Sequence, residues 1–133
     1  MLSVLDYAVN VLKVKHVIVV GHYGCGGVLA AMSNNQFGII DNWLRNIKDV
    51  YRLYAAELDA IEDEKERGNR LVELNVVESV DRLAQTSIVQ NAWKNGQNLS
   101  VHGWVYSLQT GYIKDLKVSS SNNHKLDEVF KLV

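Results

Sequence analysis

A histidine and the only cysteine of the chain, His22 and Cys25, stand close together in the stretch GHYGCGG. An imidazole nitrogen and a thiolate sulfur are ligands that suit zinc, so the pair is a candidate metal site. A structural zinc site has four protein ligands, and a catalytic one has three with an open position for water. Any further ligand would have to be a histidine or a carboxylate brought near by the fold, because the chain has no second cysteine.

The same two side chains admit other chemistry. If Cys25 lies at the first turn of a helix, the helix dipole and the free N–H groups favour its thiolate. A thiolate is also a nucleophile, with His22 as a candidate base, although no third residue that would orient such a base is identifiable. In a third interpretation the pair has no chemical role. His22 is then a turn residue and Cys25 a small buried thiol, since free cysteine is often part of a core.

Four glycines surround the pair: Gly21, Gly24, Gly26 and Gly27. Residues without a Cβ let the backbone approach a small anion or a metal-bound oxygen closely. Their spacing matches neither the Rossmann fingerprint nor a Walker loop, which ends in Lys-Ser/Thr, so a phosphate loop is disfavoured. The glycines therefore predict a tight turn that can also form the wall of a small site.

A strand before this stretch and a helix after it must position the two side chains. Residues 16–20 form a β-branched run without polar alternation, which predicts a parallel strand covered on both faces that stops at Gly21. A helix begins at Gly26 and ends before the polar loop at residues 33–36. The glycine-rich stretch is thus predicted to be a strand-to-helix turn.

The remaining sequence is mostly helical and contains no proline. Apolar residues recur at helical spacing in three further segments: 3–13, 40–58 and 70–94. Thr86 and Ser87 divide the last of these into two helices. The charged segment 62–68 is typical of a solvated helix end or a loop.

Alternating apolar residues over 99–106 and an extended run over 112–118 predict a β-hairpin, and a short helix is expected to close the chain at residues 126–133. One strand and a hairpin make a sheet that is short of the parallel neighbours which a doubly covered strand requires. We therefore expect an α/β fold in which a partner chain or an additional upstream segment covers the strand.

Composition excludes several classes of partner. The 133 residues suit one domain, residues 1–133, and their 47% hydrophobic content includes no block long enough to cross a membrane. The net charge is −1 and the 14 basic residues are dispersed, so neither nucleic acid nor a lipid surface is expected as a partner. The N-terminus has no secretory features and one cysteine makes no internal disulfide, which predicts a reducing, cytoplasmic setting.

Residues 16–28, HVIVVGHYGCGGV, closely resemble the second zinc-ligand motif of the β-class carbonic anhydrases. Further segments resemble the same family in the same order: 3–9, 75–80, 87–93 and 96–106. The resemblance covers nearly the whole chain. It implies a helix-flanked, mainly parallel sheet, a zinc enzyme that interconverts carbon dioxide and bicarbonate, and assembly as a homo-oligomer, either a dimer or a tetramer.

By this resemblance His22 and Cys25 are zinc ligands, and the backbone at Gly26 and Gly27 lines the substrate cleft. Zinc in such a site lowers the pKa of a bound water, and the resulting hydroxide attacks carbon dioxide. The family also carries an upstream Cys-x-Asp-x-Arg motif, which supplies a third ligand and an Asp-Arg pair, and this sequence does not contain it. We therefore expect a chain that lacks the family's N-terminal segment, holds zinc weakly and has hydration activity near background.

Two other classes of function stay open. In one, the chain is a non-catalytic scaffold that associates with itself or with a full-length relative through apolar surface. In the other, Cys25 is a reactive thiol that works without metal. Zinc bound at one ion per chain would instead require a recruited ligand, for which Asp41 and His102 are candidates.

Overall fold

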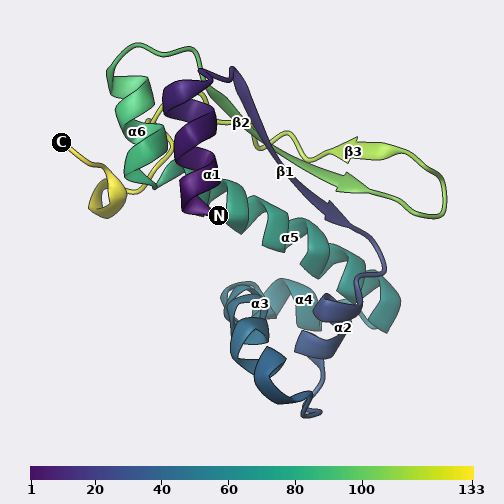
Figure 1. The fold of residues 1–133 in the computed structure, drawn as a ribbon. Coiled ribbons are helices and arrows are strands. Elements are labelled where there is room, and N and C mark those ends of the chain that lie inside the picture. Colours follow the sequence, from purple (N-terminus) through teal and green to yellow (C-terminus); the bar gives the residue numbers. More distant parts are fainter.

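In a computed structural model, which describes residues 1–133, helices lie along one side of a three-stranded sheet (Figure 1). Strand β1 (His16–His22) pairs in parallel with β2 (Ser100–Tyr106), and β2 pairs in antiparallel fashion with β3 (Ile113–Asp115). The parallel pair is the longer one, so the predicted α/β fold with a mainly parallel sheet is confirmed. The predicted hairpin is confirmed as β2 and β3, although β3 is shorter than the run that suggested it.

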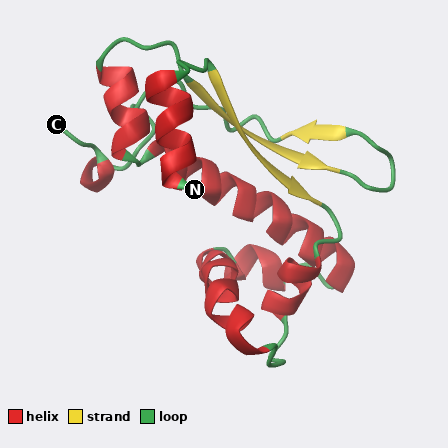
Figure 2. Cartoon of the chain, viewed as in Figure 1, coloured by secondary structure: helices red, strands yellow, loops and turns green.

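The helices account for most of the remaining chain (Figure 2). They are α1 (Leu2–Asp6), continued by a π-helical turn over Tyr7–Val11, α2 (Gly26–Met32), α3 (Asp41–Leu53), α4 (Ala55–Asp59), α5 (Glu64–Ala84) and α6 (Ser87–Lys94), with 3-10 turns at Gly38–Ile40 and Glu128–Phe130. The predicted division before α6 is confirmed, because Thr86 is the N-cap of that helix and its hydroxyl accepts a hydrogen bond from Val89 N. None of these helices is both long and apolar enough to span a bilayer.

The longest helix, α5, begins within the charged segment and not at Arg70. The Asp63 carboxylate caps it by accepting a hydrogen bond from Glu66 N at 2.7 Å. Glu64 and Glu66 lie in the first turn, where the helix dipole stabilises carboxylates. The cap at Asp63 therefore lets α5 begin within the charged segment, before its apolar residues start to recur.

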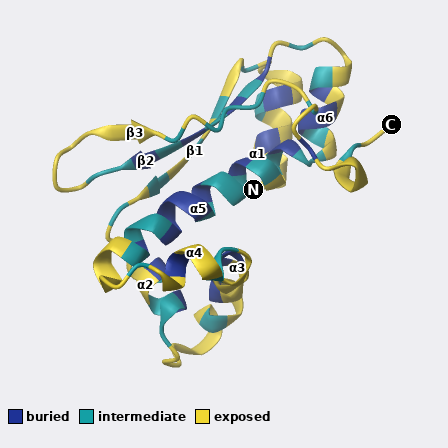
Figure 3. Cartoon of the chain, turned by 180° about the vertical axis from the view of Figure 1, so that it is seen from behind, coloured by how far each residue is buried: buried dark blue, intermediate teal, exposed yellow.

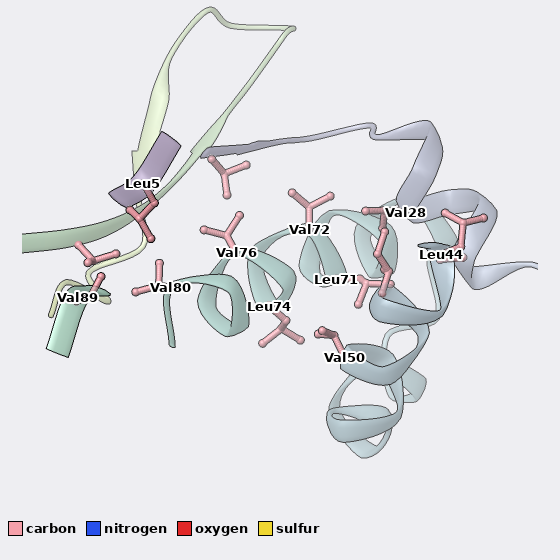
Figure 4. Packing of buried hydrophobic residues seen from close by; sticks show 14 of the residues in the cluster. Leu5, Val28, Leu44, Val50, Leu71, Val72, Leu74, Val76, Val80 and Val89 are labelled. Atoms are coloured by element: carbon pink, nitrogen blue, oxygen red, sulfur yellow. The ribbon is translucent and has the colours of Figure 1, made fainter. Parts of the chain in front are cut away.

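One face of the sheet packs on α5, whose buried side chains line the core in Figure 4. A Cβ built on Gly21 of β1 would lie 2.7 Å from Val76 Cγ2, and one on Gly103 of β2 would lie 3.0 Å from Val80 Cγ2. The first distance is shorter than real Cβ contacts and the second is tighter than most of them, so glycine at these two positions lets α5 approach the strands closely.

Strand β1 is covered on one face only. Ile18 and Val20 are 40% and 54% exposed, and they alternate with half-buried residues along the strand, as the colouring of β1 in Figure 3 indicates. β1 is also an edge strand of the sheet. The prediction of a strand covered on both faces is therefore wrong for this chain, because α5 covers one face and no element covers the other.

The predicted C-terminal helix is also wrong, since only the 3-10 turn at Glu128–Phe130 forms. A segment this short cannot offset the cost of helix nucleation. Gln90 of α6 holds the tail instead. Its buried amide donates to the Phe130 carbonyl at 2.9 Å and accepts from Leu132 N at 2.9 Å.

Candidate functional site

His22 and Cys25 lie at the carboxyl end of β1, where α/β folds commonly bind ligands. His22 is the last residue of β1 and pairs with Tyr106, whereas Cys25 occupies the N-cap position of α2. The predicted strand-to-helix turn is therefore confirmed. The strand extends past Gly21 to His22 because β2 continues to pair with it there.

The imidazole of His22 is exposed, and the backbone sets its orientation. Its Nδ1 atom lies 3.1 Å from the carbonyl oxygen of Tyr23. Because a carbonyl only accepts hydrogen bonds, Nδ1 of the neutral ring carries the proton and Nε2 keeps its lone pair. Nε2 makes no hydrogen bond within the chain, so it is available to a ligand.

The thiol of Cys25 is free and half-buried, and it lines a pocket of about 430 Å³. Val28 and Leu29 of α2 form one wall of this pocket, and Lys65 and Asn69 at the start of α5 form another. The pocket thus opens between the first turns of two helices.

Gly26 and Gly27, predicted to line a substrate cleft, form the first turn of α2 directly after Cys25. A Cβ on Gly27 would lie 3.8 Å from the Cys25 sulfur, whereas one on Gly26 would meet no atom within 4 Å. The Trp43 ring also lies 3.7 Å from that Gly27 position, so the Gly26 backbone is the open one of the two.

His22 and Cys25 suit zinc by the type of their donor atoms, but they do not complete a site. The structure contains no group of three or more His, Cys, Asp or Glu side chains that could hold a metal ion. Two donors leave a tetrahedral ion open on two sides. The chain therefore brings two side chains with zinc-type donor atoms to the end of β1, and no third joins them.

The residues considered as replacement ligands have other partners. Both carboxylate oxygens of Asp41 accept from Phe37 N, at 3.0 and 3.1 Å. His102 contacts Ser119 Oγ through Nδ1 at 2.7 Å and His16 Nδ1 through Nε2 at 3.0 Å. Neither residue joins His22 and Cys25 in a metal-binding group.

A buried carboxylate that was not predicted from the sequence lies behind the turn. Glu73 of α5 is only 8% exposed and accepts hydrogen bonds from the Tyr23 hydroxyl at 2.5 Å, Lys114 Nζ at 2.7 Å and the Arg70 guanidinium at 2.8 Å. Burial acts to raise the pKa of Glu73, but the hydrogen bonds from Lys114, Tyr23 and Arg70 outweigh it and lower the pKa below its usual value. Glu73 is thus held as a carboxylate inside the fold.

The same helix also contacts the next residue of the turn. Asn69 lies one helical turn before Glu73, and its Oδ1 accepts a hydrogen bond from Gly24 N at 3.3 Å. Gly24 has a φ of +68°, a conformation that favours glycine. α5 therefore holds both residues that separate His22 from Cys25.

The fold and the turn define an α/β protein with a glycine-rich turn at the end of a parallel strand. The family model for carbonic anhydrase matches residues 1–113. A carbonic anhydrase of Emericella nidulans is 55% identical over 117 residues, which are 88% of this chain and 51% of that protein. The chain belongs to the β-carbonic anhydrase family, and it spans about half the length of the curated relatives it matches.

Solved structures agree with this assignment. A Coccomyxa β-carbonic anhydrase in complex with acetazolamide has a TM-score of 0.86 and 36% identity, covering 91% of this chain and 55% of its own. A tetrameric β-carbonic anhydrase of Sordaria macrospora has a TM-score of 0.82 and 39% identity, covering 90% of this chain and 60% of its own. The described fold is therefore part of the family's fold.

Proposed function

We propose that the protein serves the reversible hydration of carbon dioxide to bicarbonate and a proton, with zinc as its cofactor. Membership of the β-carbonic anhydrase family supports the reaction. The observation that carries the proposal is the turn at the end of β1, where His22 keeps Nε2 free and Cys25 lines a pocket. The comparisons favour this function over a non-catalytic scaffold and over a metal-free thiol.

His22 would hold zinc through Nε2, and Cys25 through its thiolate. The chemistry that zinc supplies when bound is a water of lowered pKa, which serves as a nucleophile near neutral pH. The chain's own residues orient the imidazole through the Tyr23 carbonyl and place the thiol beside the backbone of Gly26 and Gly27. At Gly26 that backbone is open to a small substrate, since a Cβ there would meet no atom within 4 Å.

The isolated chain supplies only two of the three protein ligands of a catalytic zinc site. We therefore propose that it holds zinc weakly and hydrates carbon dioxide at a rate near background. A third donor from another polypeptide would raise both the zinc content and the rate.

A second copy of the chain is the partner we propose, in the reducing setting of the cytoplasm. The tetrameric assembly of the Sordaria macrospora relative supports it. Apolar side chains that stand open to solvent on α1 and β1 also support it, among them Val4 at 73% and Val20 at 54% exposure. Contiguous exposed apolar surface is typical of protein interfaces.

The test is the zinc content of the purified chain, measured by mass spectrometry beside the His22→Ala/Cys25→Ala double variant, together with stopped-flow carbon dioxide hydration. We expect less than one zinc per chain after dialysis, uptake of zinc on titration, and no uptake by the double variant. Equal zinc in both proteins would place the metal elsewhere. Fast hydration by the isolated chain would contradict the need for a third donor.

A further inference from the structure

Tyr23, which separates His22 from Gly24 and Cys25, is held at three points. Its backbone N donates to the Tyr106 carbonyl at 3.0 Å, which extends the contact between β1 and β2 by one residue. Its hydroxyl donates to Glu73 Oε1 at 2.5 Å, and its own carbonyl accepts from His22 Nδ1 at 3.1 Å. Tyr23 is therefore tied to β2 through its backbone N and to α5 through its side chain. The peptide group that its carbonyl shares with Gly24 is tied to α5 as well, because Gly24 N donates to Asn69 Oδ1.

Glu73 is itself fixed by two cations. Lys114 of β3 contacts Oε1, and Arg70 contacts Oε2 while also donating to Glu57 at 2.5 Å. A carboxylate held on both oxygens in a nearly buried position has little freedom to move. The anchor of the Tyr23 hydroxyl is thus rigid.

A role in stability alone does not explain this arrangement. Glu73 interrupts the otherwise mostly apolar run LVELNVV in the middle of α5. Replacing a buried ionic group and its partners by well-packed apolar residues is often neutral or stabilising, so stability alone does not require a carboxylate at this position. What it does contribute is a fixed direction for one hydroxyl beside the turn.

We propose that Glu73 is a positioning residue for His22, acting through Tyr23. By holding the Tyr23 side chain, it fixes the residue whose carbonyl accepts from His22 Nδ1, and so keeps the ring in the Nδ1–H form with Nε2 directed to a metal. The direction of Nε2 to a metal rests on the proposed function. The orientation of the ring and its tautomer are properties of the metal-free chain. The hydrogen-bond partner of a histidine ligand, here the Tyr23 carbonyl, commonly sets the tautomer and the basicity of that ligand.

The first test reads the tautomer directly. Nitrogen NMR of the metal-free chain at about pH 8, where histidine is neutral, distinguishes a protonated from an unprotonated ring nitrogen. We expect Nδ1–H for His22 in the natural chain and a mixture of both tautomers in Tyr23→Phe. Tyr54→Phe is the matched control, because Tyr54 likewise donates to a carboxylate, that of Glu78, at 2.6 Å. An unchanged tautomer in Tyr23→Phe, or an equal change in the control, would overturn the proposal.

Glu73→Gln gives a second variant, with folding checked by circular dichroism because the change weakens the contacts of Lys114 and Arg70. We expect the same mixture of tautomers as in Tyr23→Phe. If Glu73→Gln folds and keeps the Nδ1–H form, Glu73 does not act through Tyr23 and the proposal fails.

A metal titration tests this inference separately from the proposed function. Cadmium titrated against the chain is followed by the absorbance of its bond to the Cys25 thiolate, and we expect affinity about 10- to 100-fold lower in Tyr23→Phe. Absence of a cadmium–thiolate signal in the natural chain would count against the proposed zinc ligands, and the tautomer measurement would still decide the role of Glu73. Equal affinity in both proteins would contradict the metal-directing step.

Discussion

Gly21 and Val76 are in contact where β1 lies against α5, at a distance that leaves no room for a side chain on the strand. A Cβ on Gly21 would lie 2.7 Å from Val76 Cγ2 and 3.2 Å from Val72 Cγ1. Both valines belong to the buried core. The approach of α5 to the end of β1 therefore depends on this glycine, which directly precedes His22.

Gly21→Ala is expected to lower the free energy of unfolding by about 1–3 kcal/mol, because the added methyl forces packed side chains to shift. Urea denaturation measures the change. Gly26→Ala is the control, since a Cβ there meets no atom within 4 Å. Stability equal to that of the natural chain in Gly21→Ala would show that α5 can withdraw without cost.

Glu73 is expected to stabilise the fold above the acid range and to lose that effect as the pH falls. Its pKa in the fold lies below the ordinary value of 4.5, because the hydrogen bonds from Lys114, Tyr23 and Arg70 outweigh burial. The unfolded chain therefore binds the proton first as the pH decreases, and stability declines below about 4.5.

Urea denaturation over that range compares the natural chain with Glu73→Gln. At neutral pH we expect the variant to be less stable by about 2 kcal/mol, since hydrogen bonds to a charged group are lost. The difference should shrink as the pH falls below about 4.5. Glu62→Gln, at an exposed position, is the control. A difference that stays constant with pH would argue against a charged Glu73 in the fold.

Tyr54 is expected to be the last tyrosine to ionise. The hydrogen bond to Glu78, together with burial and nearby carboxylates, raises the pKa of Tyr54 from 10.0 to about 12. Because the folded-state pKa is the higher one, the stabilisation is complete below about 10 and is lost as the pH rises toward 12. Phenolate absorbance of Tyr54→Phe should lack this late step, and its persistence would assign the step to another tyrosine.

A charge on the open face of β1 is expected to weaken self-association. Val20 is 54% exposed on that face, so Val20→Lys should fold normally while placing an ammonium in the proposed interface. Light scattering should then show a smaller mass than for the natural chain. Val129→Lys, at an 83% exposed position in the C-terminal 3-10 turn, is the control. Equal masses for all three proteins would exclude the face of β1 from the interface.

Local sequence was sufficient to predict the turn that carries His22 and Cys25. An apolar run, a glycine cluster and a helical segment follow one another within residues 16–32, so each signal lies beside the next. The start of α5 was also accessible, since Asp63 and Glu66 have the spacing of a capping box. If this capping signal is given more weight than the high charge of residues 62–68, the start of α5 is predicted correctly.

The contacts that anchor the turn could not be predicted from local sequence. Glu73 joins Tyr23 from the turn after β1, Lys114 from β3 and Arg70 from its own helix. Tyr23 and Lys114 lie far from Glu73 in the sequence. A single carboxylate in an apolar run indicates an unusual position, but the sequence does not indicate which residues bind it. The open face of β1 was not predicted for a related reason. The apolar residues of the strand indicate that it prefers to be buried, but they do not indicate which element covers it.

The pairing of β1 with β2 has a consequence for the order in which the protein is made and folded. His16 pairs with Ser100, and Tyr23 N reaches the Tyr106 carbonyl, so the turn closes only after the residues up to Tyr106 have left the ribosome. Contacts this distant in sequence form slowly. Until then the Cys25 thiol and the His22 ring are carried by an unanchored segment, so the nascent chain has a period in which this thiol lacks the shelter of the folded pocket.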